Sequence, residues 1–362
     1  METRPCITRR PGAAIDAVSN IEYSALHVAA GKGLRDVCTL LLDAGASLHV
    51  VDDDGDTPLH YAAYLEPEIT DLLLSRGAAI DAINISRNAL HVAARFGQRK
   101  LCTFLSDAGA PLYVVDKYGC TPLHCVALSN QPEITELLLS RGAAIDAVNN
   151  IKRSTLHVAA KHRQRKLCTL LLANGASLCV VDKYRNTPLH CAAYALREER
   201  AMRYHCDVNV QDFYGDIALH EAIRKNALDV IDALLCACER VDFTLRNKQD
   251  FNILHHAAFK GNAHIMERLI TCARHSLVDM KMENGTTALH LATLRGHRQV
   301  AAILLSQNGG RAKVDLRNNR GQTPLCLATL QKHWPLVELM VHHNADVSSI
   351  DLDGNNVLHI AT

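Results

Sequence analysis

The stretch VDKYGCTPLHCVA, residues 115–127, decides the fold because the chain keeps returning to its central Leu-His pair. The histidines of these pairs are His27, His60, His91, His124, His157, His190, His220, His255, His290 and His359. Cys326, in TPLC, stands at the one remaining position. Successive positions are 30 to 36 residues apart, and most often 33. A period of this length predicts one solenoid of stacked repeats instead of separate globular domains.

A single repeat predicts a turn, a helix, a loop and a second helix. The turn starts at Asp116, a residue type that favours turn starts, and contains Gly119, which tolerates positive φ. Thr121 is placed to cap the first helix, and Pro122 suits its first position, where no amide donor is needed. Leucines at helical spacing predict the second helix from about Glu133.

This order of elements in about 33 residues, with TPLH opening the first helix, resembles the ankyrin repeat. LHVAAGKGLRDVCTLLLDAGASL, residues 26–48, matches that family's core almost throughout. The resemblance covers about residues 12–362. It implies an all-α ankyrin-repeat solenoid with β-hairpin-like turns, of about ten repeats plus a C-terminal stub. It also implies a non-catalytic scaffold or adaptor that binds a protein partner on its concave face.

The repeats fall into two groups. After an N-terminal segment, 1–11, residues 12–196 consist of three copies of a 65-residue, two-repeat unit, because SRGAAIDA occurs at 75–82 and again at 140–147. Residues 197–206 form an irregular seam without the usual leucines, and 207–362 hold longer repeats, the last one incomplete. Three turns lack the usual glycine and are expected to be less regular; the residues at that position are Glu22, Ser86 and Lys152.

Both ends of the chain are expected to expose apolar surface that a further repeat would cover. The chain stops at LHIAT, inside a predicted first helix, and starts without a preceding capping repeat. Terminal repeats of solenoids normally have a polar outer face. We therefore expect a piece of a longer polypeptide or a truncated gene model.

Composition narrows the function classes. The 39 basic and 38 acidic residues nearly cancel, so no attraction of the whole chain to nucleic acid or membrane is expected. No apolar run approaches 18 residues, so membrane insertion is not expected. Cys38, Cys102 and Cys168 share one repeat position, which indicates small buried side chains rather than disulfides. A reducing, intracellular location, cytoplasmic or also nuclear, follows as an expectation.

The recurring histidines could indicate metal or proton chemistry, or hydrogen bonds that join one turn to the next. Neighbours one repeat apart lie roughly 10 Å from each other, which is too far to share a zinc ion. His220-Glu221 opens like a zinc-protease helix, but Arg224 stands where the second histidine is required. We predict that the ten histidines are structural anchors. Catalytic, cofactor and metal sites and a small-molecule substrate are not expected.

Residues at the turn tips are the candidate partner-binding site. Tips and first helices form the exposed concave face of this fold, and aromatic and basic side chains are enriched at binding hot spots. The alternative is that tip residues vary freely and only cover the adjacent tip. The candidates are Lys117, Tyr118, Lys183, Tyr184, Arg185, Phe213 and Tyr214.

A basic patch offers a second interpretation. KHRQRK, residues 161–166, repeats the pattern of RFGQRK, residues 95–100, at the end of a first helix and in the following loop. It could bind an acidic peptide or RNA, or be a solvated loop copied by duplication. The balanced charge and the absence of an RNA-binding motif argue against nucleic acid.

Residues 207–305 are similar to the ankyrin region of mind bomb E3 ubiquitin ligases. The matching features are the pair His255-His256, the run Asp242-Phe243-Thr244 and the lengthened repeats. The resemblance implies a relation to Notch-pathway ubiquitination. The sequence contains no CxxC pairs and hence no RING zinc site, so the alternative function is a fragment of such a ligase without its RING.

Overall fold

The computed structural model describes residues 15–18, 23–65, 67–82, 84, 87–192, 207–235, 241–273, 277–306 and 310–361. These residues contain α-helices and no β-strand, and one isolated bridge joins Val148 to Ser154. The predicted all-α repeat fold is therefore confirmed. By packing, the chain divides into two units, Met1–Ser177 and Leu178–Thr362, each described by itself.

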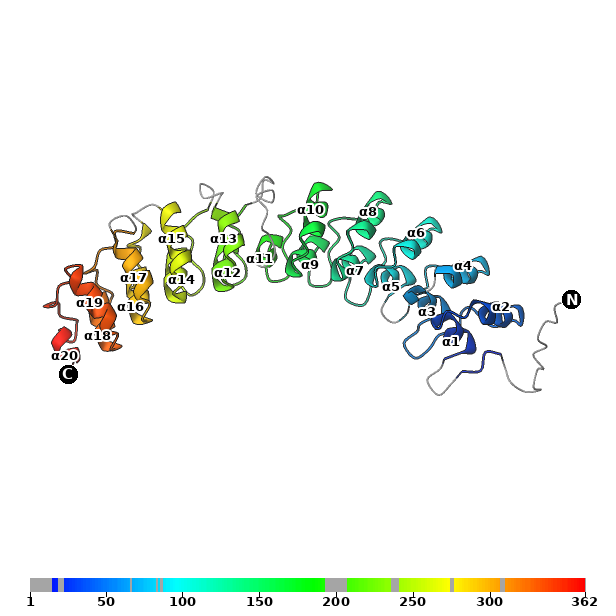
Figure 1. The fold of residues 1–362 in the computed structure, drawn as a ribbon, viewed down its shortest axis with the longest axis horizontal. Helices are drawn as coiled ribbons and strands as arrows, with labels where there is room; N and C mark the ends of the chain where they lie inside the picture. The colour runs from blue at the N-terminus through cyan, green and yellow to red at the C-terminus, as the bar shows by residue number, and fades with distance from the viewer. Residues whose placement is uncertain are drawn as a thin grey trace. The chain divides into compact units, whose positions relative to one another are not determined.

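The first unit is a double layer of short helices (Figure 1). The first helices of its repeats are α1 (Ala25–Gly31), α3 (Pro58–Leu65), α5 (Ala89–Arg95), α7 (Pro122–Ser129) and α9 (Thr155–Lys161). The second helices are α2 (Arg35–Asp43), α4 (Pro67–Ser75), α6 (Arg99–Asp107), α8 (Pro132–Ser140) and α10 (Arg165–Ala173). Each first helix packs on the next first helix, and each second helix on the next second helix.

The second unit repeats this double layer. Its first helices are α11 (Pro188–Ala192), α12 (Ala218–Arg224), α14 (Ile253–Lys260), α16 (Ala288–Leu294), α18 (Pro324–Leu330) and α20 (Val357–Ala361). Its second helices are α13 (Leu228–Leu235), α15 (Ala263–Cys272), α17 (Arg298–Leu305) and α19 (Trp334–His342). The predicted seam, 197–206, lies outside the described residues, and the domain boundaries drawn from the sequence stay predictions.

The start of each first helix follows from its local sequence. Helix α7 begins at Pro122 with Thr121 as N-cap, and His124 completes a capping box with the Thr121 backbone. Its partner α8 begins at Pro132, one residue before the predicted start. Helices of 5 to 10 residues are too short to be stable alone in water, so their stability comes from packing between repeats.

The core lies between the two helix layers and is made of small and branched side chains. Leu26, Leu90 and Leu123 of the recurring motif are at most 1% exposed. The shared cysteine position behaves in the same way, because Cys102 and Cys168 are fully buried. Burial raises the pKa of both thiols to about 12, so they pack as small apolar groups.

The turns between repeats are held by one side chain each. Asp116 Oδ1 accepts hydrogen bonds from the amides of Tyr118 and Cys120, both over 2.8 Å. The expectation of a less regular turn at Lys152 is wrong. This residue takes the left-handed conformation, with φ 57°, and its amide donates to Asn149 O over 2.8 Å, as that of Gly119 donates to Asp116 O. Contacts with neighbouring repeats impose this left-handed conformation, although lysine disfavours it. The other two positions, Glu22 and Ser86, lie outside the described residues.

Candidate partner-binding surface

The recurring histidines occupy the same hydrogen-bonded position in both units. His124 Nδ1 lies 3.2 Å from the Thr121 amide, which donates to it, and 2.9 Å from Thr121 Oγ1. Nε2 lies 2.9 Å from the carbonyl oxygen of Arg153 in the next repeat. Since a carbonyl only accepts, the proton is assigned to Nε2 and the lone pair to Nδ1.

The link to the next repeat has the same form along the chain. The Nε2 atom of each of seven further histidines lies 2.9 to 3.1 Å from a backbone carbonyl oxygen of the next repeat. The pairs are His27 with Asp56, His60 with Arg87, His91 with Cys120, His190 with Asp216, His220 with Phe251, His255 with Met280 and His290 with Gln322. At His157 and His359, hydrogen bonds to Nδ1 come from Ser154 and Asn356. These contacts support the predicted anchor role, which stays a prediction until the stability test below.

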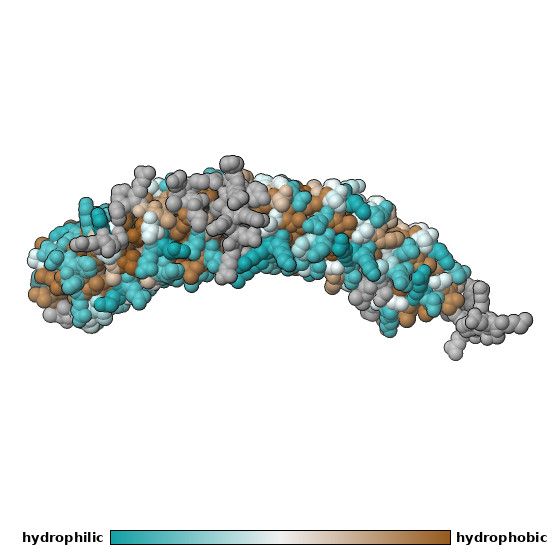
Figure 2. Space-filling view, turned by 45° about the horizontal axis from the view of Figure 1, so that its top comes forward, coloured by the Kyte–Doolittle hydropathy of each residue, from teal (hydrophilic) through white to brown (hydrophobic). Residues whose placement is uncertain are grey.

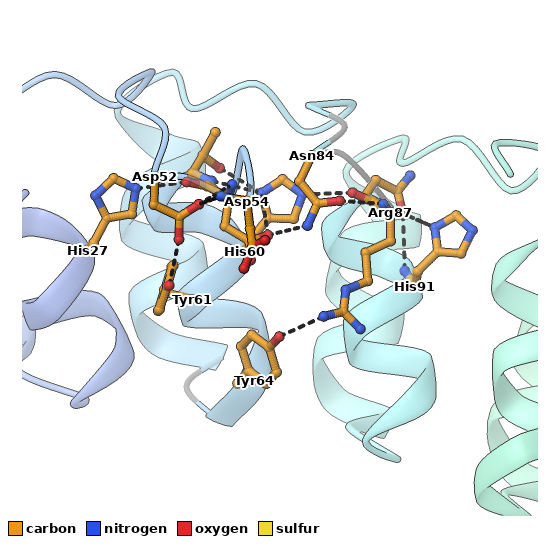
Figure 3. A network of polar contacts seen from close by, with 12 residues as sticks. His27, Asp52, Asp54, His60, Tyr61, Tyr64, Asn84, Arg87 and His91 are labelled. Atoms are coloured by element: carbon orange, nitrogen blue, oxygen red, sulfur yellow. Dashed lines mark hydrogen bonds and ion pairs between the residues drawn. The ribbon is translucent and has the colours of Figure 1, made fainter. Parts of the chain in front are cut away.

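Figure 3 shows how these histidines join a wider polar network in the first unit. Tyr61 donates to Asp52 Oδ2 over 2.7 Å, and Arg87 donates to the Tyr64 hydroxyl over 3.0 Å. Asn84 donates to Asp56 Oδ1. The network therefore combines a hydrogen bond within one repeat with bonds between neighbouring repeats, and its histidines have both ring nitrogens in use.

Burial keeps the anchors neutral. It lowers the pKa of His220, His255 and His290 to about 4, because an imidazolium loses solvation in the core. A protonated ring would also lose the acceptor at Nδ1. The anchors are thus suited to hydrogen bonding, and their two nitrogens are not available for general acid–base work.

In the first unit the candidate tip residues Lys117 and Tyr118 are exposed and lie next to each other. Lys117 Nζ lies 5.3 Å from the centroid of the Tyr118 ring, which is 63% exposed. The backbone below them is fixed, because the Asn150 amide donates to Tyr118 O over 3.0 Å and Asn150 Nδ2 donates to Lys117 O over 3.0 Å.

In the second unit the other candidates are exposed as well. The Phe213 and Tyr214 rings meet edge to face with centroids 5.5 Å apart. Tyr184 is joined to them through its backbone, since the Phe213 amide donates to Tyr184 O over 2.9 Å. Lys183 and Arg185 are exposed at the same tip, where Arg185 takes φ 63° in place of a glycine.

A feature that the sequence did not indicate is a ladder of backbone hydrogen bonds between tips, the tip ladder. In each bond the amide of one tip donates to a carbonyl of the preceding tip over 2.8 to 3.0 Å. The pairs are Asn150 to Tyr118 in the first unit, and Phe213 to Tyr184, Lys248 to Tyr214, Asn319 to Asn284 and Leu352 to Arg320 in the second. The tip backbones are therefore fixed, while their side chains stay at the surface.

A second feature that the sequence did not reveal is the cluster of Asp216, His220 and His256. One ligand atom from each lies within 4.8 Å of the others, and all three are buried. His220 uses both nitrogens for the anchor bonds. Asp216 accepts from Asn247 Nδ2 over 2.8 Å and lies 3.4 Å from an Arg224 nitrogen. A cation would have to displace these bonds and the arginine, so the arrangement favours a hydrogen-bonded cluster.

His256 differs from the anchors, and the sequence signal for it was the pair His255-His256. Its ring lies 5.6 Å from that of His220, centroid to centroid. Within the described part of the chain its buried Nδ1 has no hydrogen-bond partner. The two histidines of the pair point to different neighbours, because His255 faces its own anchor bonds and His256 faces the previous repeat.

The basic patch lies at the end of α9 and the start of α10. Lys161, Arg163, Arg165 and Lys166 are exposed, and Gln164 between them is buried. The predicted position, at the end of a first helix and in the following loop, holds for Lys161 and Arg163, whereas Arg165 and Lys166 begin the second helix, α10. A role of the patch in binding acidic peptide or RNA stays a prediction. A binding constant that falls steeply with salt would support nucleic acid, and a flat response would contradict it.

Hydrophobic and hydrophilic residues are interleaved on the face that Figure 2 presents, without one continuous apolar area. None of the helices in the described ranges has the length and apolar character to cross a lipid bilayer.

Comparison with known proteins gives matches to repeat proteins throughout the chain. Profiles of ankyrin repeats in groups of three match residues 7–84, 83–149, 156–247 and 219–314, and a single ankyrin repeat matches 320–352. The chain is 33% identical over 116 residues to the B-cell lymphoma 3 protein homolog of Mus musculus, covering 30% of this chain and 26% of that protein.

Two further relatives show the same pattern. Tyrosine-protein kinase HTK16 of Hydra vulgaris is 32% identical over 113 residues, covering 30% of this chain and 15% of the kinase. Protein phosphatase 1 regulatory subunit 12A of Mus musculus is 39% identical over 72 residues, covering 19% of this chain and 7% of that subunit. The chain thus matches about a quarter or less of the length of these relatives, and the similarity of residues 207–305 to mind bomb ligases stays untested by them.

Proposed function

Because the chain belongs to the ankyrin-repeat family, we propose that it is a non-catalytic scaffold that binds protein partners through its tips and first helices. The candidate contact residues are those of the tips: Lys117, Tyr118, Lys183, Tyr184, Arg185, Phe213 and Tyr214. The mechanism needs no cofactor: the chain presents a preformed surface. Because this surface is already ordered, association loses less conformational entropy than it would with a flexible binder.

The observation that supports this most is the contrast between backbone and side chains at the tips. The tip ladder fixes the backbones of Tyr184, Phe213 and Tyr214, yet their side chains are 47%, 54% and 59% exposed. A monomer gains little from exposed aromatic rings on a fixed frame, whereas a partner can bury them at low entropic cost.

The relatives support a regulatory role. Ankyrin-type matches occur in a protein named as a phosphatase regulatory subunit and in a B-cell lymphoma 3 homolog. We place the function inside the cell, in the cytoplasm or nucleus, since no disulfide joins two cysteines of the described ranges.

The test is affinity capture with two matched variants of the full chain. The tip variant replaces Tyr184, Phe213 and Tyr214 by Ala. The control variant replaces Tyr113 and Trp334 by Ala, which removes aromatic rings that are 81% and 51% exposed and are not candidate contact residues; Tyr113 precedes the turn that starts at Asp116, and Trp334 is the first residue of α19. Partners crosslinked to the wild-type tips are expected to be lost from the tip variant and retained by the control. Equal recovery of every partner from all three proteins would contradict the proposal.

The alternative that residues 207–305 belong to a ubiquitin-ligase scaffold rests on sequence resemblance. Its test is the transcript beyond Thr362. RING-type cysteine pairs downstream would support a ligase of the mind bomb kind, and a stop codon directly after a capping repeat would contradict it.

A further inference from the structure

A cleft of about 400 Å³ lies between two neighbouring repeats of the second unit. We call it the basic cleft. Tyr214 and Lys248 come from the tips, Arg224 from α12, and His256, Phe259 and Lys260 from α14. It therefore opens where tips and first helices meet, on the surface proposed above for partners.

The charges that line the cleft are unbalanced. Arg224 is neutralised, since it forms ion pairs with Glu221 and with Asp216, whose side chain is only 7% exposed. Lys248 and Lys260 are exposed, and within the described ranges neither forms an ion pair. Two positive charges without an ion-pair partner thus line one cleft and favour an anionic occupant, because a negative charge bound there is attracted to both.

The cleft also offers apolar and hydrogen-bonding surface. The Phe251 and Phe259 rings lie 5.4 Å apart, and both line the cleft. Lys248 Nζ lies 3.8 Å from the centroid of Phe213, so this lysine is held at the tip. Burial lowers the pKa of His256 to about 4, so its ring is neutral and keeps one N–H donor. The two phenylalanine rings can therefore pack against methylene groups of an occupant, and the lysine and the histidine N–H can bind its carboxylate.

The basic surface continues into the next repeat. The Arg295 guanidinium lies 4.0 Å from the centroid of the Phe259 ring, on the side of the cleft formed by α14. Arg295 is exposed and follows the last residue of α16. The step from one first helix to the next is about 10 Å, which corresponds to about three residues of extended chain.

We propose that the basic cleft receives a glutamate or aspartate side chain from an extended segment of a protein partner, with a second acidic residue about three positions along the segment facing Arg295. The carboxylate lies between Lys248 and Lys260, and the apolar part of the segment covers Phe251 and Phe259. This inference rests on the proposed function, because it identifies the chemistry of the partner that the tips and first helices bind.

The test uses a phage-displayed library of random linear peptides selected on the full chain. The same selection is made on the cleft variant Lys248→Glu/Lys260→Glu and on the control variant Lys313→Glu/Lys332→Glu. Each variant replaces two exposed lysines by glutamates, so the change in net charge is identical. Circular dichroism and thermal unfolding confirm that both variants are folded.

The expected result is enrichment of peptides with two acidic residues spaced by about three on the wild type and on the control. An enriched peptide should bind the cleft variant at least about tenfold more weakly, and its Glu→Gln version should lose a similar factor on the wild type. The inference would be overturned if the selected peptides are not enriched in acidic residues, or if an enriched peptide binds the cleft variant as tightly as the wild type. Either result would still be compatible with a peptide-binding scaffold. If no peptide is selected although partners are still captured through the tips, the inference of an acidic segment would be overturned and the proposed scaffold function would not.

Discussion

The backbone amide of Lys248 donates a hydrogen bond to the carbonyl oxygen of Tyr214 over 2.8 Å. One residue later, an added Cβ on Gly215 would lie 2.9 Å from the Cα atom of Asn247. At this turn an added Cβ would therefore press on the next tip, whereas the Tyr184 tip accommodates Arg185 at the corresponding position under the same kind of ladder bond. The same geometry recurs in the first unit, where it can be tested with a matched control.

The first prediction concerns Gly119 and Gly142, which both have positive φ, 74° and 87°. Alanine at either position costs roughly 1–2 kcal/mol of conformational strain. At Gly119 the new Cβ would also lie 2.6 Å from the Asn150 amide nitrogen, whereas at Gly142 no atom lies within 4 Å. Gly119→Ala should therefore lower the free energy of unfolding more than Gly142→Ala, measured by urea titration. Equal losses would show that the tips can separate without cost.

The second prediction concerns the side chain that holds the turn. Asp212 Oδ1 accepts from the Tyr214 amide over 2.7 Å and from the Asp216 amide over 2.9 Å. Asn247 makes the same pair of bonds in the next turn. Asp212→Ala should cost about 1–3 kcal/mol because one buried and one partly buried donor lose their acceptor, while Asp212→Asn should cost less than about 1 kcal/mol. Hydrogen exchange of the 212–216 amides shows whether the stability is lost at this turn or elsewhere. Equal protection of these amides in the Ala and Asn variants would contradict the prediction.

The third prediction is a loss of stability in mild acid. The unfolded histidines bind protons near pH 6.5, but in the folded chain His220, His255 and His290 bind them only near pH 4. Between these values the unfolded state holds more protons, so stability is full above about pH 6.5 and falls as the pH drops towards 4. Each histidine contributes roughly 3 kcal/mol to this loss.

Urea titrations between neutral pH and pH 4.5 measure the effect. The variant His290→Cys is the control, since Cys326 occupies the same position in the following repeat and accepts a hydrogen bond from Thr323 over 3.3 Å. Its stability should depend less on pH than that of the wild type. A wild-type unfolding midpoint that stays constant over this range would contradict the anchor role.

The fourth prediction concerns thiol reactivity. Burial raises the pKa of Cys102, Cys125 and Cys168 to about 12, so they hold almost no thiolate at neutral pH. Cys179 is exposed. Iodoacetamide should label Cys179 in the folded chain and reach the other three only after urea unfolds it. Labelling of Cys102 at the same rate as Cys179 in native buffer would mean that the first unit opens locally.

The start of helix α7 shows why so much of the fold could be predicted. Thr121 and His124 form a capping box and Pro122 brings no amide donor that would need a partner, so the start of the helix is settled within four residues and the signal is local. The turn at Lys152 shows the opposite case. Its side chain disfavours the left-handed conformation, but the turn is held by the Asn149 side chain and by the bond from the Asn150 amide to Tyr118 O of the preceding repeat, a contact that no local pattern reveals.

The sequence by itself determined the period, the two helices of each repeat and the exposed positions of Tyr118, Tyr184, Phe213 and Tyr214, because capping, helical spacing and turn chemistry act between residues close in the chain. Only the tertiary structure decided that Tyr214 and Lys248 share a backbone bond, and that His220 and His256 lie side by side. It alone placed Lys248 and Lys260 around one cleft. Lys248 and Lys260 are only 12 positions apart, but the cleft that they line also needs Tyr214 and Arg224 of the preceding repeat. Tyr214 and Lys248 are 34 positions apart and His220 and His256 are 36 apart, so these contacts depend on how one repeat stacks on the next.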